Sequence, residues 1–179
     1  HTTAHFEIQH NSETSEVEAL GTCLERTYQS VLGWCRDLDI PTHTPFELLA
    51  VALFDKFKDF VALRDRLAPG VDAVGLYVPQ SNLAVFCHLD RLPMIEALDH
   101  ELAKRTPGAQ TDDFRAQRET HVARLRQLVV AHEAAHQVLF NIGVLDRSRD
   151  YSFWLVEGLA CQFETACNGS SGVRAKFWI

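Results

Sequence analysis

The chain has 179 residues, of which 46% are hydrophobic and 23% are charged, as is typical of a globular domain with an apolar core. The formal net charge of −7, without a long run of Lys or Arg, argues against nucleic acid as a partner. No apolar run approaches the ~20 residues that a transmembrane helix needs, so a membrane span is not expected. We expect a single domain over residues 1–179, and the apolar end Phe177-Trp178-Ile179 favours a piece of a longer protein.

A strand and a long helix are predicted at the start of the chain. Residues 3–9 alternate apolar and polar side chains, which is typical of a half-buried strand. Ser15 and Glu18 have the spacing of a capping box, so a helix should begin there and end near residue 38, before Pro41. One face of this helix carries apolar residues at intervals of three and four, namely Val17, Leu20, Leu24, Tyr28, Val31 and Cys35. We expect this face to pack in the core.

The middle of the chain predicts three further strands and a short helix. The apolar run at 46–54 predicts a buried strand, and residues 55–67 predict an amphipathic helix. Residues 73–78 and 83–89 form two apolar runs that are separated by the turn sequence Pro79-Gln80-Ser81-Asn82. This arrangement predicts a β-hairpin with a four-residue loop.

Two more helices follow. Residues 93–104 predict a helix that ends at the break Thr106-Pro107-Gly108. A longer helix should run from about 112 to 141, because this stretch is free of Pro and Gly from residue 114 onward. Asp112 or Asp113 can cap its start, and Gly143 can adopt the left-handed conformation that ends it.

The long helix contains the sequence His-Glu-x-x-His, formed by His132, Glu133 and His136. Residues four apart lie on one face of a helix, so the two imidazoles can bind one zinc ion. Glu133 lies beside His132, where a general base can reach a zinc-bound water without ligating the metal. The structural alternative is a pair of hydrogen-bonded histidines on a half-buried helix.

A catalytic zinc needs a third protein ligand from a separate element, and residues 152–164 can provide it. Ser152 is a candidate N-cap for a helix that is apolar on nearly all sides and should be buried. Glu157 lies in its middle, where a metal would offset the cost of burying a carboxylate; the alternative is an ion pair with an Arg. Gly158 weakens the helix by ~1 kcal/mol, so we expect another backbone to pass close to it.

These two segments resemble the gluzincin metallopeptidases of the thermolysin-like clan, and in particular an uncharacterised bacterial family of the peptidase-MA-like branch. The resemblance covers residues 128–164 and rests on HEAAH and WLVEGLA. It implies that His132, His136 and Glu157 bind Zn²⁺ and that Glu133 is the catalytic base. Cys161 stands where the thermolysin pattern has an Asp that supports a zinc ligand. The Gly-x-Met-Glu-Asn motif of related aminopeptidases is absent, so aminopeptidase activity is not expected.

The resemblance implies a zincin-like α+β fold, with a small mixed sheet of about four strands, an N-terminal helix, the HExxH helix and the third-ligand helix. It also implies hydrolysis of peptide bonds in a peptide or protein substrate, with one strand of the hairpin at 73–89 lining the cleft. Glu164 and Asp150 are equal candidates to support a histidine ring, and Tyr151 is a candidate to stabilise the oxyanion. The alternatives are a catalytically inactive zincin-like binding module and a zinc hydrolase that acts on a non-peptide substrate.

The five cysteines lack a Cys-x-x-Cys pair, so a thiolate zinc site is not expected. Cys161 and Cys167 would lie ~9 Å apart on a continuous helix, which is too far for a disulfide. The odd count leaves at least one free thiol. Cysteine usage leaves the compartment undecided, with an extracytoplasmic or secreted location slightly favoured over the alternatives.

Overall fold

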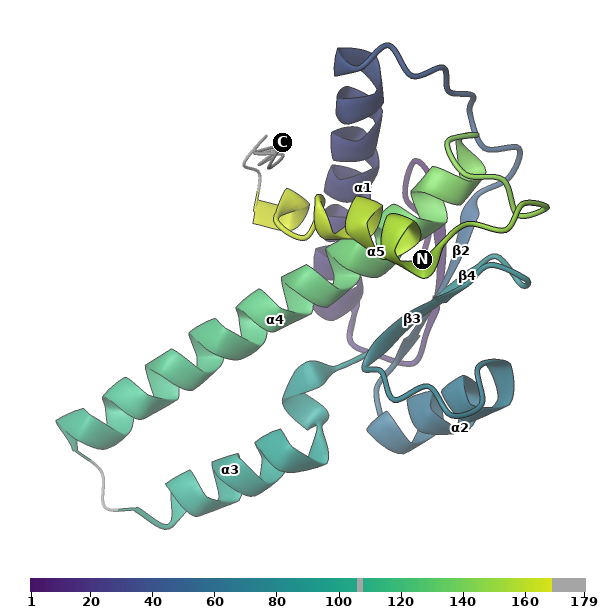
Figure 1. Ribbon diagram of the computed structural model, residues 1–179. Helices are drawn as coiled ribbons and strands as arrows, with labels where there is room; N and C mark the ends of the chain where they lie inside the picture. The colour runs from purple at the N-terminus through teal and green to yellow at the C-terminus, as the bar shows by residue number, and fades with distance from the viewer. Residues whose placement is uncertain (106–107, 169–179) are drawn as a thin grey trace.

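The structure is a computed structural model that describes residues 1–105 and 108–168 (Figure 1). Thr106 and Pro107 of the predicted break, and the apolar end Phe177-Trp178-Ile179, lie outside the described residues. In the part of the chain that is described, no helix has both the length and the apolar character to cross a membrane.

Among the described residues, four strands form one mixed sheet, which confirms the predicted α+β class. The strands are β1 (Phe6–His10), β2 (Leu49–Phe54), β3 (Gly75–Val78) and β4 (Leu83–Cys87). Their order across the sheet is β1-β2-β4-β3, in which β1, β2 and β4 are parallel and β3 is antiparallel to β4. The predicted hairpin is therefore confirmed, and its first strand, β3, lies at an edge of the sheet.

Helices cover both faces of this sheet. The described α-helices are α1 (Thr14–Asp37), α2 (Phe57–Leu67), α3 (Pro93–Ala103), α4 (Ala109–Asn141) and α5 (Phe153–Cys161), with short 3₁₀ turns η1 (Leu89–Arg91) and η2 (Ala166–Asn168). Successive side chains of a strand point to opposite faces, and β4 follows this rule. Ala84 and Phe86 pack in the core that α1 and α4 cover, whereas Val85 and Cys87 pack with Phe60 of α2.

The first helix has the predicted core face but a different start. All six residues of the predicted apolar stripe are buried. The helix begins at Thr14 after the N-cap residue Glu13, so Ser15 lies inside the first turn and the predicted capping box is wrong. The next predicted strand is also shorter than expected, because β2 begins at Leu49 and Phe46 is 98% exposed on the preceding loop.

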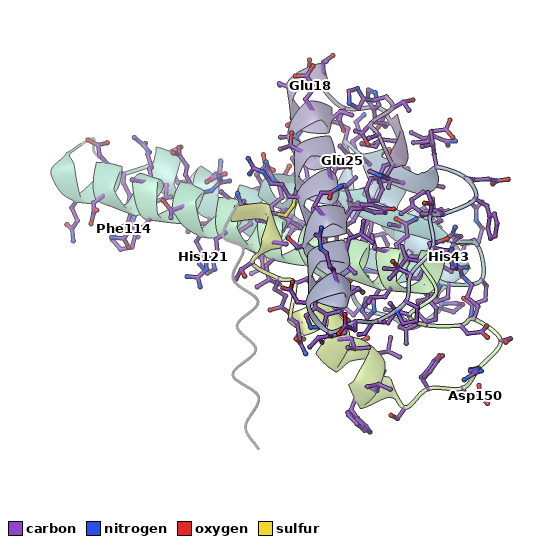
Figure 2. All side chains as sticks on the ribbon, turned by 90° about the horizontal axis from the view of Figure 1, so that it is seen from above. Glu18, Glu25, His43, Phe114, His121 and Asp150 are labelled. Carbon is purple, nitrogen blue, oxygen red and sulfur yellow. A yellow bond between two sulfur atoms is a disulfide. The ribbon has the colours of Figure 1, made fainter. Side chains whose placement is uncertain are left out.

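The longest helix, α4, spans 33 residues and extends well beyond the sheet (Figure 1). Its N-cap residue is Gly108, so the predicted caps Asp112 and Asp113 are wrong. Gly143 has a φ of 89°, which confirms the left-handed stop. Figure 2 shows Phe114 and His121 on the part of α4 that projects from the body of the molecule. The second half of α4 packs against α1 and β3.

A disulfide joins Cys23 of α1 to Cys167 of η2, with Cα atoms 4.7 Å apart (Figure 2). The sequence did not predict this pairing. Of the described cysteines, Cys35 and Cys87 are free and buried, and Cys161 is free and exposed, so the expected free thiols are present. The disulfide ties the segment after α5 to the first helix.

Candidate metal centre

The two histidines of the His-Glu-x-x-His motif lie on one face of the buried half of α4. Their rings meet edge to face with centroids 4.8 Å apart, and the Nε2 atoms are 3.1 Å apart. The side chain of His132 is 15% exposed and that of His136 is 8% exposed. The helical spacing thus brings both nitrogens to one point, as the sequence predicted.

Glu157 of α5 reaches the same point from the other side. Its Oε2 lies 3.1 Å from His132 Nε2, and its Oε1 lies 3.5 Å from His136 Nε2. Tetrahedral zinc with bonds of about 2.0–2.1 Å would hold such donors about 3.3 Å apart. The three side chains therefore have the donor types and the mutual spacing that a zinc ion requires. Their donor atoms form one of the groups in the described chain that could hold a metal ion.

The protonation state of His136 also suits a metal ligand. The pKa of His136 is lowered to about 4, first by burial and then by the neighbouring His132, while Glu157 opposes this shift. At neutral pH the ring is therefore uncharged, which is the form that binds a cation. Two Nε2 lone pairs and a carboxylate at these distances repel unless they share a proton or hold a cation.

Glu133 lies beside the three candidate ligands and makes its own contact with the sheet. Its Oε2 accepts a hydrogen bond from the backbone N–H of Tyr77 in β3, at 2.8 Å. Burial raises the pKa of Glu133, and Glu157 adds to this effect, whereas His132 and the Tyr77 N–H oppose it. A carboxylate with a raised pKa and a fixed orientation is suited to accept a proton at neutral pH.

The close approach of β3 to α4 depends on Gly75. A Cβ at this position would overlap with Val129 Cγ1 and would also contact Glu133. Gly75 is buried in the strand, and glycine inside a strand often marks such an approach of another element. Neither Gly75 nor the Tyr77 N–H was predicted from the sequence, although the glycine was a signal that could have located this contact.

Glu164 supports His132 from the side that faces away from Glu157. Its Oε1 lies 3.2 Å from His132 Nδ1. Asp150, the other candidate for this role, is exposed on the loop between α4 and α5 (Figure 2). Tyr151, a candidate to stabilise the oxyanion, accepts a hydrogen bond at its hydroxyl from the Asp146 N–H, at 3.1 Å.

Three contacts hold the segment that carries Glu164 against α1. Phe163 is 2% exposed, and its ring packs edge to face on Trp34 with centroids 5.8 Å apart. Arg26 Nη1 donates a hydrogen bond of 2.8 Å to the Cys167 carbonyl, and the Cys23–Cys167 disulfide completes the attachment. The position of Glu164 is thus determined by the core and not by α5 alone.

Two expectations for the third-ligand helix are wrong. Helix α5 lies at the surface, with Phe153 79% and Trp154 74% exposed, because it packs through one side only. Within the described part of the chain, a Cβ at Gly158 would meet no atom within 4 Å, so no backbone passes close to it. Ser152 is the N-cap residue, as expected.

A hollow of about 630 Å³, lined by polar and apolar residues alike, opens at the end of α4. Phe140, one turn after His136, lines it together with Arg147, whose guanidinium lies 5.9 Å from the Phe140 ring. Arg147 also donates hydrogen bonds to the Tyr77 hydroxyl, at 2.9 Å, and to Asn82 Oδ1, at 2.7 Å. The loop after α4 is thereby attached to the hairpin.

Two imidazole nitrogens and one carboxylate that converge beside a second carboxylate define a candidate centre for one metal ion. A family model described as "Protein of unknown function (DUF1570)" matches residues 127–176, which contain all four of these side chains. The match covers less than a third of the chain. None of the curated proteins and none of the solved structures matches the chain.

Proposed function

We propose that this protein is a zinc-dependent metallopeptidase of the gluzincin type. The observation that carries the proposal is the convergence of His132 Nε2, His136 Nε2 and Glu157 within 3.1–3.5 Å of one another. The resemblance of HEAAH and WLVEGLA to the gluzincins agrees with this donor set. We assign His132, His136 and Glu157 as the zinc ligands and Glu133 as the catalytic base.

A zinc ion bound there would polarise the scissile carbonyl and lower the pKa of a coordinated water. Glu133 then takes the proton of the attacking water and passes it to the nitrogen of the leaving amine. The Tyr77 N–H holds Oε2 of this carboxylate, so the second oxygen, Oε1, is the one oriented to exchange the proton. Burial of Glu133 favours the protonated form that this transfer requires.

The edge strand supports a peptide as the substrate. In an antiparallel strand the N–H and C=O of one residue point to the same side. Because the Tyr77 N–H points to Glu133 and not to β4, the Tyr77 carbonyl also points away from β4, on the side of the strand where Glu133 lies. An extended peptide can add to such an edge through backbone hydrogen bonds. The hollow is lined by Phe140 and Arg147, which both contact the Tyr77 side chain, and it can receive a side chain of the peptide.

The test combines metal analysis with a cleavage assay on casein and a peptide library. We expect one zinc per chain in the wild type and in Glu133→Ala, with cleavage only in the wild type. Glu119→Gln, an exposed carboxylate on the projecting part of α4, is the matched control and should retain activity. Substituting His136 by Ala should abolish zinc binding at this centre.

Three outcomes would overturn the proposal in different ways. A protein that does not take up zinc at neutral pH has no metal centre of this kind. Stoichiometric zinc without any cleavage that depends on Glu133 would favour a catalytically inactive binding module. Cleavage of an ester or another non-peptide bond that Glu133→Ala abolishes would identify a zinc hydrolase with a different substrate.

The disulfide supports a proposal on location. Structural disulfides persist in oxidising compartments and are rare in reducing ones. The Cys23–Cys167 bond is buried, with Cys23 8% and Cys167 3% exposed. We infer an extracytoplasmic location for this protein. Mass spectrometry of the protein from its native source, after thiol alkylation, should find these two cysteines unmodified.

A further inference from the structure

His132 lies between two sets of donor atoms, one at each nitrogen of its ring. Nε2 faces His136 and Glu157, whereas Nδ1 faces Cys161 and Glu164. We propose that His132 Nδ1, Cys161 Sγ and Glu164 Oε1 form a second cation site for thiophilic ions such as Cd²⁺, Cu⁺ or excess Zn²⁺. Cation binding at this second site does not depend on the proposed function. Its effect on activity does rest on the proposed function of the first site, which consists of His132 Nε2, His136 and Glu157.

The geometry of the second set meets the requirements of such an ion. The donor atoms of His132, Cys161 and Glu164 all lie within 4.8 Å of one another, and His132 Nδ1 is 3.2 Å from Glu164 Oε1. A thiolate, an imidazole and a carboxylate are all zinc ligands, and the thiolate selects for soft ions. On binding, the Cys161 S–H proton passes to solvent and the sulfur donates its electron pair to the cation.

Cys161 is the thiol that a dissolved ion can reach. Among the described cysteines, Cys35 and Cys87 are free but buried, and Cys23 is bonded to Cys167. Cys161 lies exposed at the last residue of α5, one turn before Glu164. Solvent can therefore supply the remaining ligand of the ion at this position.

Occupation of the second site competes with the first because the two sites share one ring. A neutral imidazole carries a proton on one nitrogen and offers a lone pair on the other. A cation at Nδ1 therefore places the proton on Nε2, which can then donate to Glu157 but can no longer bind zinc. Thiophilic ions in excess should thus inhibit the enzyme through Cys161 and displace the ion from the first site.

The experiment is a Cd²⁺ titration of the metal-free protein, followed by the ultraviolet charge-transfer band of a cadmium–thiolate bond. We expect the band in the wild type and its loss in Cys161→Ser. The two histidines give a matched pair: His136→Ala should keep the band, because His136 belongs only to the first set, and His132→Ala should lose it. Preloading the wild type with one equivalent of zinc should shift the band to higher Cd²⁺ concentrations.

A wild type without the band, or a band that survives in Cys161→Ser or in His132→Ala, would overturn the proposal. Circular dichroism of each variant checks that it is folded, and the exposed position of Cys161 makes its Ser variant the least perturbing of them. If the protein takes up no zinc at the first site but the band depends on Cys161 and His132, the proposed function fails and the second site stands. If zinc binds at the first site and supports cleavage, but Cd²⁺ produces no cadmium–thiolate band, the proposed function stands and the second site fails.

Discussion

The backbone N–H of Tyr77 donates a 2.8 Å hydrogen bond to Glu133 Oε2, so the edge strand β3 and the helix α4 meet at the proposed catalytic carboxylate. This contact fixes the position of the proposed base relative to β3, the strand to which we expect a peptide substrate to bind, before any ligand is present. It also means that the two elements cannot shift relative to each other without disturbing Glu133.

Replacing Glu133 by Gln should stabilise the metal-free protein at pH 7. Burial raises the pKa of Glu133, so the ionised form that prevails above the folded-state pKa opposes folding. The Gln amide oxygen can still accept the Tyr77 hydrogen bond. Urea unfolding should show a higher free energy of unfolding than in the wild type at pH 7, and the gain should shrink as the pH falls through the raised pKa. The same difference in the free energy of unfolding between the variant and the wild type at pH 7 and at pH 4 would contradict this prediction.

Two glycine-to-alanine substitutions should have opposite signs. Gly75→Ala places a Cβ against Val129 Cγ1, and because valine has little rotamer freedom the strand or the helix must shift. We expect a loss of about 1–3 kcal/mol in the free energy of unfolding, together with weaker cleavage. Gly158→Ala, at an exposed helical position with open space around it, should gain up to ~1 kcal/mol. Equal effects of the two substitutions would contradict the described contact.

The stability of the metal-free protein should fall as the pH falls from about 6.5 to about 4. The pKa of His136 is lowered to about 4 in the folded protein, from an ordinary value of 6.5, first by burial and then by His132. The unfolded chain therefore binds more protons within this window, and protonation favours unfolding. Measured in a Glu133→Gln background, His136→Gln should show a smaller fall in the free energy of unfolding. If the free energy of unfolding falls equally with pH in both proteins, His136 is not a buried, neutral residue.

Glu164→Gln should weaken zinc binding roughly 10–100-fold, the usual effect of removing a hydrogen-bond partner of a metal-bound histidine. The reason is the 3.2 Å contact between Glu164 Oε1 and His132 Nδ1, which orients the ring. Asp150→Asn is the matched control, because the sequence offered both carboxylates for this role and the structure leaves Asp150 exposed. Competition with a zinc chelator measures both affinities, and a larger effect of Asp150→Asn would reverse the assignment.

Removing the disulfide with Cys23→Ala and Cys167→Ala should cost about 2–5 kcal/mol of stability. The loss should be accompanied by weaker zinc binding, because the η2 segment holds the chain that carries Glu164. Cys161→Ser, which leaves the bond intact, is the control for the stability measurement. A disulfide-free protein with unchanged zinc affinity would show that Phe163 and Arg26 suffice to hold this segment.

The sequence predicted the elements whose signals are periodic. Three such signals follow from the geometry of a single helix or strand, and the structure contains all three. They are the apolar face of α1, the alternation of apolar and polar residues in the first strand, and the spacing of His132 and His136. Glu157 was located by its position in a helix and by resemblance, and the structure brings it to the histidines.

The sequence could not predict features that depend on how separate elements pack. Cys23 and Cys167 are 144 residues apart in sequence, and five cysteines allow many pairings. Gly158 was expected to mark a close contact and has none, whereas Gly75 lies against Val129, because the position of α4 over β3 is a tertiary property. Helix α5 was expected to be buried, yet its apolar Phe153 and Trp154 face outward.

The continuous course of α4 has a geometric consequence for physical measurements on this protein. One helix of 33 residues, about 50 Å long, carries both the projecting segment and the two histidines. Phe114 and His132 therefore belong to a single stiff rod, separated along its axis by about 27 Å. A spectroscopic probe at position 114 keeps a constant distance from a paramagnetic ion at His132, so the measured distance between probe and ion can locate the metal on the helix.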